Sequence, residues 1–174
     1  MLLILLVSWF VAFHALPMFL APSSQETWSN VGEKAVIIAA AASLYAPNEM
    51  KLRIATVIFG LALVPFGTAH FVYVKETASL VPGWLPWHLF WAYFFGVTFV
   101  AAGVAVIAGK YARLAAGLVT LQMGLFTVLV WVPIVTAGPN AFQWSEFVIS
   151  IALTAAGWAV ADSYLKRKPA GELR

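Results

Sequence analysis

The sequence predicts an all-α integral membrane protein with six transmembrane helices, and three observations support this fold class. Of the 174 residues, 63% are hydrophobic and 10% are charged, whereas soluble domains contain about 45–50% apolar and about 25% charged residues. Six apolar segments approach the ~20 residues needed to cross a bilayer. The basic residues gather in alternate gaps between these segments. A small water-soluble core cannot hide so much apolar surface, so the bilayer is the expected solvent.

The six expected helices are separated by gaps that contain proline or glycine, and they span Leu2–Leu20, Val31–Ala46, Ile54–Val74, Trp87–Ala108, Ala112–Val132 and Ser145–Leu165. The second is the shortest and carries Glu33 and Lys34 near its start. The first can alternatively be interpreted as a signal peptide. However, it lacks a basic start, and Phe19-Leu20-Ala21-Pro22 is a poor cleavage site. We therefore expect it to remain as a helix.

The basic residues predict the orientation of these helices. If six helices alternate, eight of the ten Lys and Arg residues fall on one side: Lys51, Arg53, Lys110, Arg113, Lys166, Arg167, Lys168 and Arg174. Lys34 and Lys75 fall on the other side. Positive loops stay cytoplasmic, so both termini are expected on the cytoplasmic side of a cytoplasmic-type membrane, with residues 166–174 as a basic tail. This orientation explains the net charge of +3 without a nucleic-acid partner.

Two segments of the chain echo each other. Trp28-Ser29-Asn30 precedes the second helix much as Trp144-Ser145-Glu146 precedes the sixth, and Ala39-Ala40 and Ala155-Ala156 follow each tryptophan at the same interval. Parallel repeats are an established membrane architecture. We therefore predict that residues 1–47 form two helices that resemble half of a second unit.

A resemblance to a known family rests on three motifs. They are Phe66-Gly67-Thr68-Ala69-His70-Phe71, Val81-Pro82-Gly83-Trp84-Leu85-Pro86-Trp87-His88-Leu89-Phe90-Trp91-Ala92-Tyr93, and Trp144-Ser145-Glu146. With these motifs the chain resembles the DoxX-like family of small four-helix membrane proteins, and residues 52–165 match one complete four-helix unit. The resemblance implies an association with quinone-linked membrane oxidoreductase systems. It therefore implies quinone as the candidate cofactor and a membrane or peripheral oxidoreductase as the partner.

Small residues at helical spacing predict the packing faces of the bundle. Ala116, Thr120 and Gly124 recur every four residues in the fifth helix, and Gly96 and Gly103 lie seven apart in the fourth. In lipid, such residues let helix backbones approach closely. We also expect Gln122 to bond across to a neighbouring helix and Pro65 to kink the third helix.

Candidate site residues gather near the expected outer leaflet. His14, His70, His88, Glu33 and Glu146 all fall at that depth, where ionisable groups usually face the bundle or water. We expect a pocket with two imidazoles, one carboxylate and aromatic walls, formed by His70, Tyr73, His88, Trp91 and Glu146. A quinol ring would suit such a pocket, because His and Glu exchange protons near neutral pH.

Other interpretations of these residues stay open. Trp84, Trp87, Trp91 and His88 can anchor the helices at the membrane interface, and Glu146 can favour a helix N-terminus. No HxxxH or HxxE pair lies within an expected helix, so no metal site is predicted. The chain contains no cysteine, which removes thiol redox chemistry.

The pattern indicates no catalytic set and no oligomeric state. Besides a quinone-linked subunit, it allows a non-enzymatic protein that binds or transports a small apolar molecule or lipid. It also allows a scaffold for a membrane partner.

Overall fold

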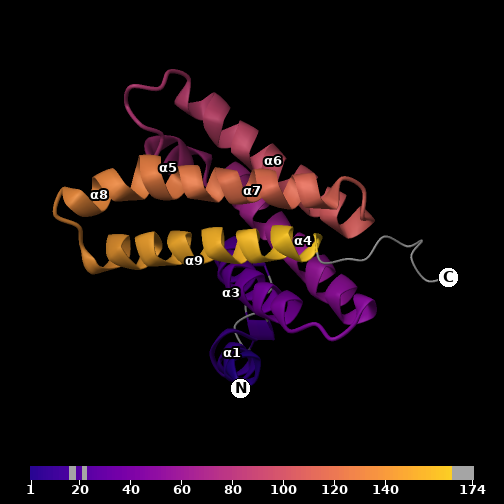
Figure 1. The fold of residues 1–174 in the computed structure, drawn as a ribbon. Coiled ribbons are helices and arrows are strands. Elements are labelled where there is room, and N and C mark those ends of the chain that lie inside the picture. The colour runs from indigo at the N-terminus through magenta and orange to yellow at the C-terminus, as the bar shows by residue number, and fades with distance from the viewer. Residues whose placement is uncertain (16–18, 21–22, 166–174) are drawn as a thin grey trace.

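The computed structural model describes residues 1–15, 19–20 and 23–165, which are helical apart from short connections. In chain order the elements are α1 (Leu2–Phe10), the π-helix η1 (Val11–Ala15), α3 (Gln25–Leu44), α4 (Glu49–Val72), α5 (Val74–Ser79), α6 (His88–Ala108), α7 (Ala112–Phe126), the π-helix η2 (Thr127–Trp131), α8 (Val132–Thr136) and α9 (Ala141–Ser163). Figure 1 shows them as a bundle of long helices with α1 at one side.

Within the described residues, four helices are long and apolar enough to cross a membrane. They are α4, α6, the continuous run α7–η2–α8 (Ala112–Thr136) and α9. They coincide with the last four predicted segments to within a few residues, so the all-helical prediction is confirmed, with four helices that could cross a membrane by length and composition. The first two predicted segments differ in detail. The α3 helix begins at Gln25, six residues earlier than predicted, and α1 gives way to η1 after nine residues.

Five helices close into a ring, in which each packs against two neighbours. The order around the ring is α3, α4, α6, α7 and α9, and α9 packs back against α3. The shared core includes Val36 and Ala39 from α3, Phe59 from α4 and Phe99 from α6. The α3 helix, from the predicted segment 1–47, therefore contributes to the same core as the helices of segment 52–165.

Glycines allow a close contact between α4 and α6. A Cβ atom on Gly60 would lie 2.9 Å from the carbonyl oxygen of Gly103, and one on Gly103 would lie 2.7 Å from that of Gly60. The two backbones touch, as small residues allow in membrane helices. Gln122 provides a polar link of the predicted kind, since the Thr98 hydroxyl of α6 donates to its side-chain oxygen on α7 at 2.7 Å.

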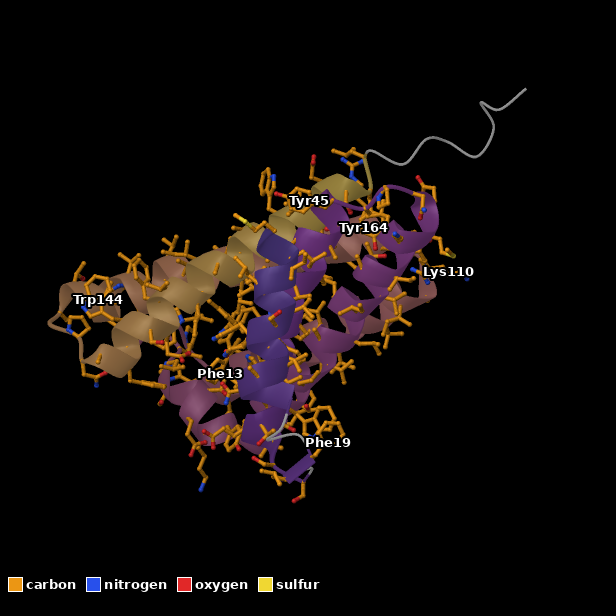
Figure 2. All side chains as sticks on the ribbon, turned by 90° about the horizontal axis from the view of Figure 1, so that it is seen from below. Phe13, Phe19, Tyr45, Lys110, Trp144 and Tyr164 are labelled. Carbon is orange, nitrogen blue, oxygen red and sulfur yellow. The ribbon has the colours of Figure 1, made fainter. Side chains whose placement is uncertain are left out.

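Four of the six basic residues that the structure describes, Lys51, Arg53, Lys110 and Arg113, lie at one end of the bundle, here called the basic end, whereas Lys34 and Lys75 lie outside it. Arg53 of α4 donates hydrogen bonds to the carbonyl oxygens of Val106 and Ile107, and so caps the C-terminus of α6, where a cation is favoured. Lys110 and Arg113 follow in the next turn and helix. Figure 2 shows Tyr45, Tyr164 and Lys110 at this end and Trp144 at the other.

The two π-helices occupy equivalent places relative to the predicted repeat. The interval of 116 residues that separates Trp28 from Trp144 also separates the starts of η1 and η2 (11 and 127) and of α3 and α9 (25 and 141). Each π-helix precedes a proline by two residues, at 17 and 133. A proline supplies no N–H and crowds the preceding turn, and a π-turn is one way for a helix to accommodate it.

Candidate functional site

The candidate site lies at the end of the bundle opposite the basic end and centres on His70. Its Nδ1 atom lies 2.7 Å from the carbonyl oxygen of Phe66. Because a carbonyl oxygen can only accept, Nδ1 carries the proton and donates this bond. The bond fixes the orientation of the imidazole ring and leaves Nε2 as the atom that can exchange a proton or bond to a ligand.

Aromatic rings hold the His70 imidazole from two sides. Its ring centre lies 5.3 Å from that of Phe99 on α6 and 6.3 Å from that of Phe126 on α7. This approach depends on Gly96, because a Cβ atom there would lie 2.9 Å from the Cβ of His70. The small residue on α6 therefore lets α4 carry the histidine into the bundle.

On one side of His70 lies an apolar cavity of about 370 Å³. It is enclosed by the end of α4, by α5 and the loop that follows, by the first turns of α6, and by α7 with η2. Its walls are formed largely by Leu, Val, Pro, Phe and Trp side chains, including Leu85, Trp91, Phe95 and Leu129. Among these lining residues His70 alone is titratable near neutral pH.

Trp91 has a defined position in the wall of the apolar cavity. Its indole N–H donates to the carbonyl oxygen of Pro86 at 3.0 Å, and its ring lies 5.8 Å from that of Phe95. The hydrogen bond ties the 80–87 loop to the first turn of α6, and so this loop stays over the cavity.

On the other side of His70 lies a smaller, acidic cavity of about 120 Å³. Glu33 from α3, Glu146 from α9 and Ser150 from α9 line it together with His70. Glu33 forms a 2.6 Å ion pair with Lys34, and both side chains are more than four-fifths buried. The charges of Glu33 and Lys34 also lie close enough to interact with the Glu146 carboxyl group.

His70, Phe126 and Trp131 line both cavities and form the wall between them. The η2 segment holds this wall against α9, because the Thr127 hydroxyl lies 2.7 Å from the Ser150 hydroxyl and 3.3 Å from that of Thr154. An imidazole therefore stands between an apolar cavity and a cavity with two carboxyl groups. Such an arrangement can bind a small apolar molecule on one side and pass a proton to the other.

Polar contacts also fix the turn of α4 below His70. Gln25 of α3 donates its side-chain amide to the Pro65 carbonyl oxygen at 3.0 Å and to the Thr68 hydroxyl at 3.1 Å. In a helix that crosses lipid, such a partner satisfies backbone groups near an internal proline. The contact therefore positions α3, and with it Glu33, against the helix that carries His70.

The structure brings together part of the predicted residue set. His70 lies beside Glu146 in the acidic cavity and beside Trp91 in the apolar cavity. Tyr73 and His88 line neither cavity. Tyr73 caps the C-terminus of α4 with its side chain exposed, and His88 is the first residue of α6. The side chain of His14, in η1, is outside the described part of the chain.

Sequence reasoning placed Glu33 at the right depth but did not include it in the predicted site, and it did not identify Phe126 or Trp131. The signal for Glu33 was present, since it is an ionisable residue in an apolar helix at the level of Glu146. Within the described residues, no group of three or more His, Cys, Asp or Glu side chains is placed to hold a metal ion.

Comparisons with protein families, with curated proteins and with solved structures find no match for this chain. The resemblance to the DoxX-like family therefore stays a prediction that rests on the motifs in the sequence.

Proposed function

We propose that this chain is a membrane subunit that binds a quinone or quinol in the apolar cavity, with the His70 imidazole on a ring oxygen. One observation carries the proposal: the single titratable side chain of the apolar cavity also borders a cavity with two carboxyl groups. A volume of about 370 Å³ falls in the range of roughly 300–1,000 Å³ typical of small-molecule sites. The aromatic walls suit a flat ring.

The proton chemistry follows from the same arrangement. Oxidation of a quinol to a quinone releases two protons and two electrons. The Nε2 atom of His70 would accept a proton from the ring oxygen, and Glu146 and Glu33 are the groups across the wall that can take it up. The electrons would pass to or from a partner oxidoreductase, which the resemblance to the DoxX-like family implies.

The topology belongs to the same proposal. The chain would cross a cytoplasmic-type membrane six times, with α1 and α3 as two crossings beyond the four apolar helices, and with both termini on the cytoplasmic side. The gathering of Arg53, Lys110 and Arg113 at one end supports this orientation. The shared interval of 116 residues supports a DoxX-like unit preceded by a half-repeat.

The test measures quinone binding by the full-length protein in detergent. Decylubiquinone and a short-chain menaquinone are titrated, and binding is detected as quenching of tryptophan fluorescence. Replacement of His70 by Phe keeps the ring but removes its polar atoms. We expect binding to weaken by about 10- to 100-fold, because a buried ring oxygen loses its partner. His88→Phe is the matched control, since His88 lines neither cavity.

Chromatography of the lipids that co-purify with the protein provides a second readout. Quinone enriched over the surrounding membrane lipid supports the proposal. Equal affinities for wild type and His70→Phe contradict it. Tight binding of an apolar molecule without ring oxygens, together with no quinone binding, would favour the alternative of a non-redox carrier or binding protein for a small apolar molecule or lipid.

A further inference from the structure

A third hollow lies away from His70, on the lipid-facing side of α7 and α9. This α7–α9 groove has a volume of about 600 Å³ and extends from Arg113 on α7 to Val128 in η2, and from Thr154 on α9 to Leu165 just after this helix. Its walls are apolar or small, and Trp158, which is 70% exposed, stands at its edge. Figure 1 shows the two helices side by side.

The protein's own side chains leave this groove open. A Cβ atom on Gly117 would meet nothing within 4 Å, and one on Gly124 would meet only the Thr154 methyl group, at 3.5 Å. By contrast, a Cβ on Gly157 would lie 2.6 Å from the Thr120 hydroxyl. Gly157 is therefore required by the contact between α7 and α9, whereas Gly117 leaves space that a bilayer component must fill.

The length of the groove favours a lipid chain over a partner helix. The fifteen-residue interval from Arg113 to Val128 corresponds to about 22 Å along the helix, and the hydrocarbon core is ~30 Å thick. The groove begins at the basic end and ends within η2 at Val128, one turn beyond Leu125, which also lines the apolar cavity. It therefore covers about three-quarters of the core, which suits an acyl chain that enters from the basic end, whereas a partner helix would need a face across the whole membrane.

Charge at the mouth of the groove indicates which lipid fits. The exposed Arg113 lines the mouth, and the exposed Lys110 lies in the connection between α6 and α7, outside the lining of the groove. Asp162 on the facing wall offsets part of this positive charge. Basic pockets between membrane helices recognise anionic lipid headgroups.

We propose that the α7–α9 groove binds an anionic phospholipid, with one acyl chain along Gly117 and Gly124 and the phosphate at Arg113. This site is separate from the proposed quinone cavity and does not depend on it. It binds a structural lipid of the leaflet at the basic end. The lipid completes the packing between α7 and α9 over Gly117 and Gly124, where the chain leaves open space.

The experiment uses the full-length protein in phosphatidylcholine vesicles. The vesicles contain dibrominated phosphatidylglycerol or dibrominated phosphatidylcholine at about 5–10 mol%, a level chosen to stay below saturation. Bromine quenches the fluorescence of nearby tryptophan. The fluorescence of Trp158 is obtained by subtracting the emission of Trp158→Phe from that of wild type. We expect quenching by the anionic lipid to occur at roughly three- to tenfold lower mole fraction than by the zwitterionic lipid.

Four variants sharpen this test. Gly117→Phe fills the groove and should abolish the selective quenching, whereas Val104→Phe, at an exposed site on α6, should leave it unchanged. Arg113→Gln should remove the preference for the anionic lipid, and Asp162→Asn should increase it. Equal quenching by the two lipids in wild type, or selective quenching that persists in both Gly117→Phe and Arg113→Gln, overturns the proposal. So does a protein dimer whose cross-links map to this groove.

Discussion

The two cavities beside His70 share a wall but differ in every other respect. The apolar cavity is about three times larger and is enclosed by α5, the 80–87 loop and η2, whereas the acidic cavity lies between α3, α7 and α9 and holds Glu33 and Glu146. An apolar ring fits the first, and only a few waters or protons fit the second. Under the proposed function, binding and proton exchange would occupy separate compartments, and the imidazole is the one titratable group that borders both.

The largest expected effect comes from removal of the shared wall. Phe126→Ala should join the two cavities and destabilise the protein by about 2–4 kcal/mol, because a large side chain leaves a void. Quinone binding should weaken as well. Thermal unfolding in detergent measures the first effect and fluorescence quenching the second. Phe142→Ala, at an exposed position on α9, is the control. An unchanged melting temperature in Phe126→Ala would mean that this ring does not separate the compartments.

The next effect tests the ion pair of the acidic cavity. Lys34→Met removes the partner of the largely buried Glu33 carboxylate and should destabilise the protein by about 1–3 kcal/mol. The double variant Glu33→Gln with Lys34→Met should recover at least half of that loss, because it leaves no unpaired charge. Thermal melts of the two variants and wild type decide this. A double variant that is less stable than the single one contradicts the pairing.

A third effect concerns the apolar cavity alone. Leu85→Trp places a larger side chain in its lining and should weaken quinone binding by about tenfold, or ~1.4 kcal/mol, while the melting temperature changes little. Leu89→Trp is the matched control, since Leu89 is exposed on α6 and lines neither cavity. If both tryptophan variants bind quinone as wild type does, the ligand does not occupy this space.

The smallest expected effect tests whether the ligand lies in the apolar cavity or in the acidic cavity. Glu146→Gln keeps the size of the side chain but removes its charge, and it should change quinone affinity by less than about threefold, or ~0.7 kcal/mol, because the ligand lies on the other side of His70. Equilibrium titration at neutral pH measures it. A loss comparable with that in His70→Phe would instead place the ligand against Glu146.

The sequence predicted the long helices well because composition and periodicity determine them. The depth of ionisable residues predicted that His70 and Glu146 lie together, and both line the acidic cavity. Tyr73 was grouped with His70 because residues three apart share a helix face. That argument fails because α4 ends at Val72, and the backbone of Tyr73 (φ −106, ψ 41) leaves the helical path. His88 begins α6 and lines neither cavity.

Other features of the fold could not be predicted from the sequence pattern. The α5 helix is short and polar, with Lys75 and Glu76, and the hydrophobic pattern gives no reason to separate it from a loop. The π-turn η2 adds one residue to a turn without changing composition, although Pro133 marks where it occurs. The role of Phe126 and Trp131 as a shared wall depends on how α7 rotates against α4, which periodicity alone does not determine.

The most direct test of the central claim is photoaffinity labelling with an azidoquinone, followed by mapping of the labelled peptides. The account predicts labels on residues of the segments 77–95 and 125–131 that line the apolar cavity, such as Leu85, Trp91 and Leu129, with loss of labelling in excess decylubiquinone and in His70→Phe. Labels confined to the lipid-facing surface or to the α7–α9 groove, or labels that excess quinone does not displace, would contradict it.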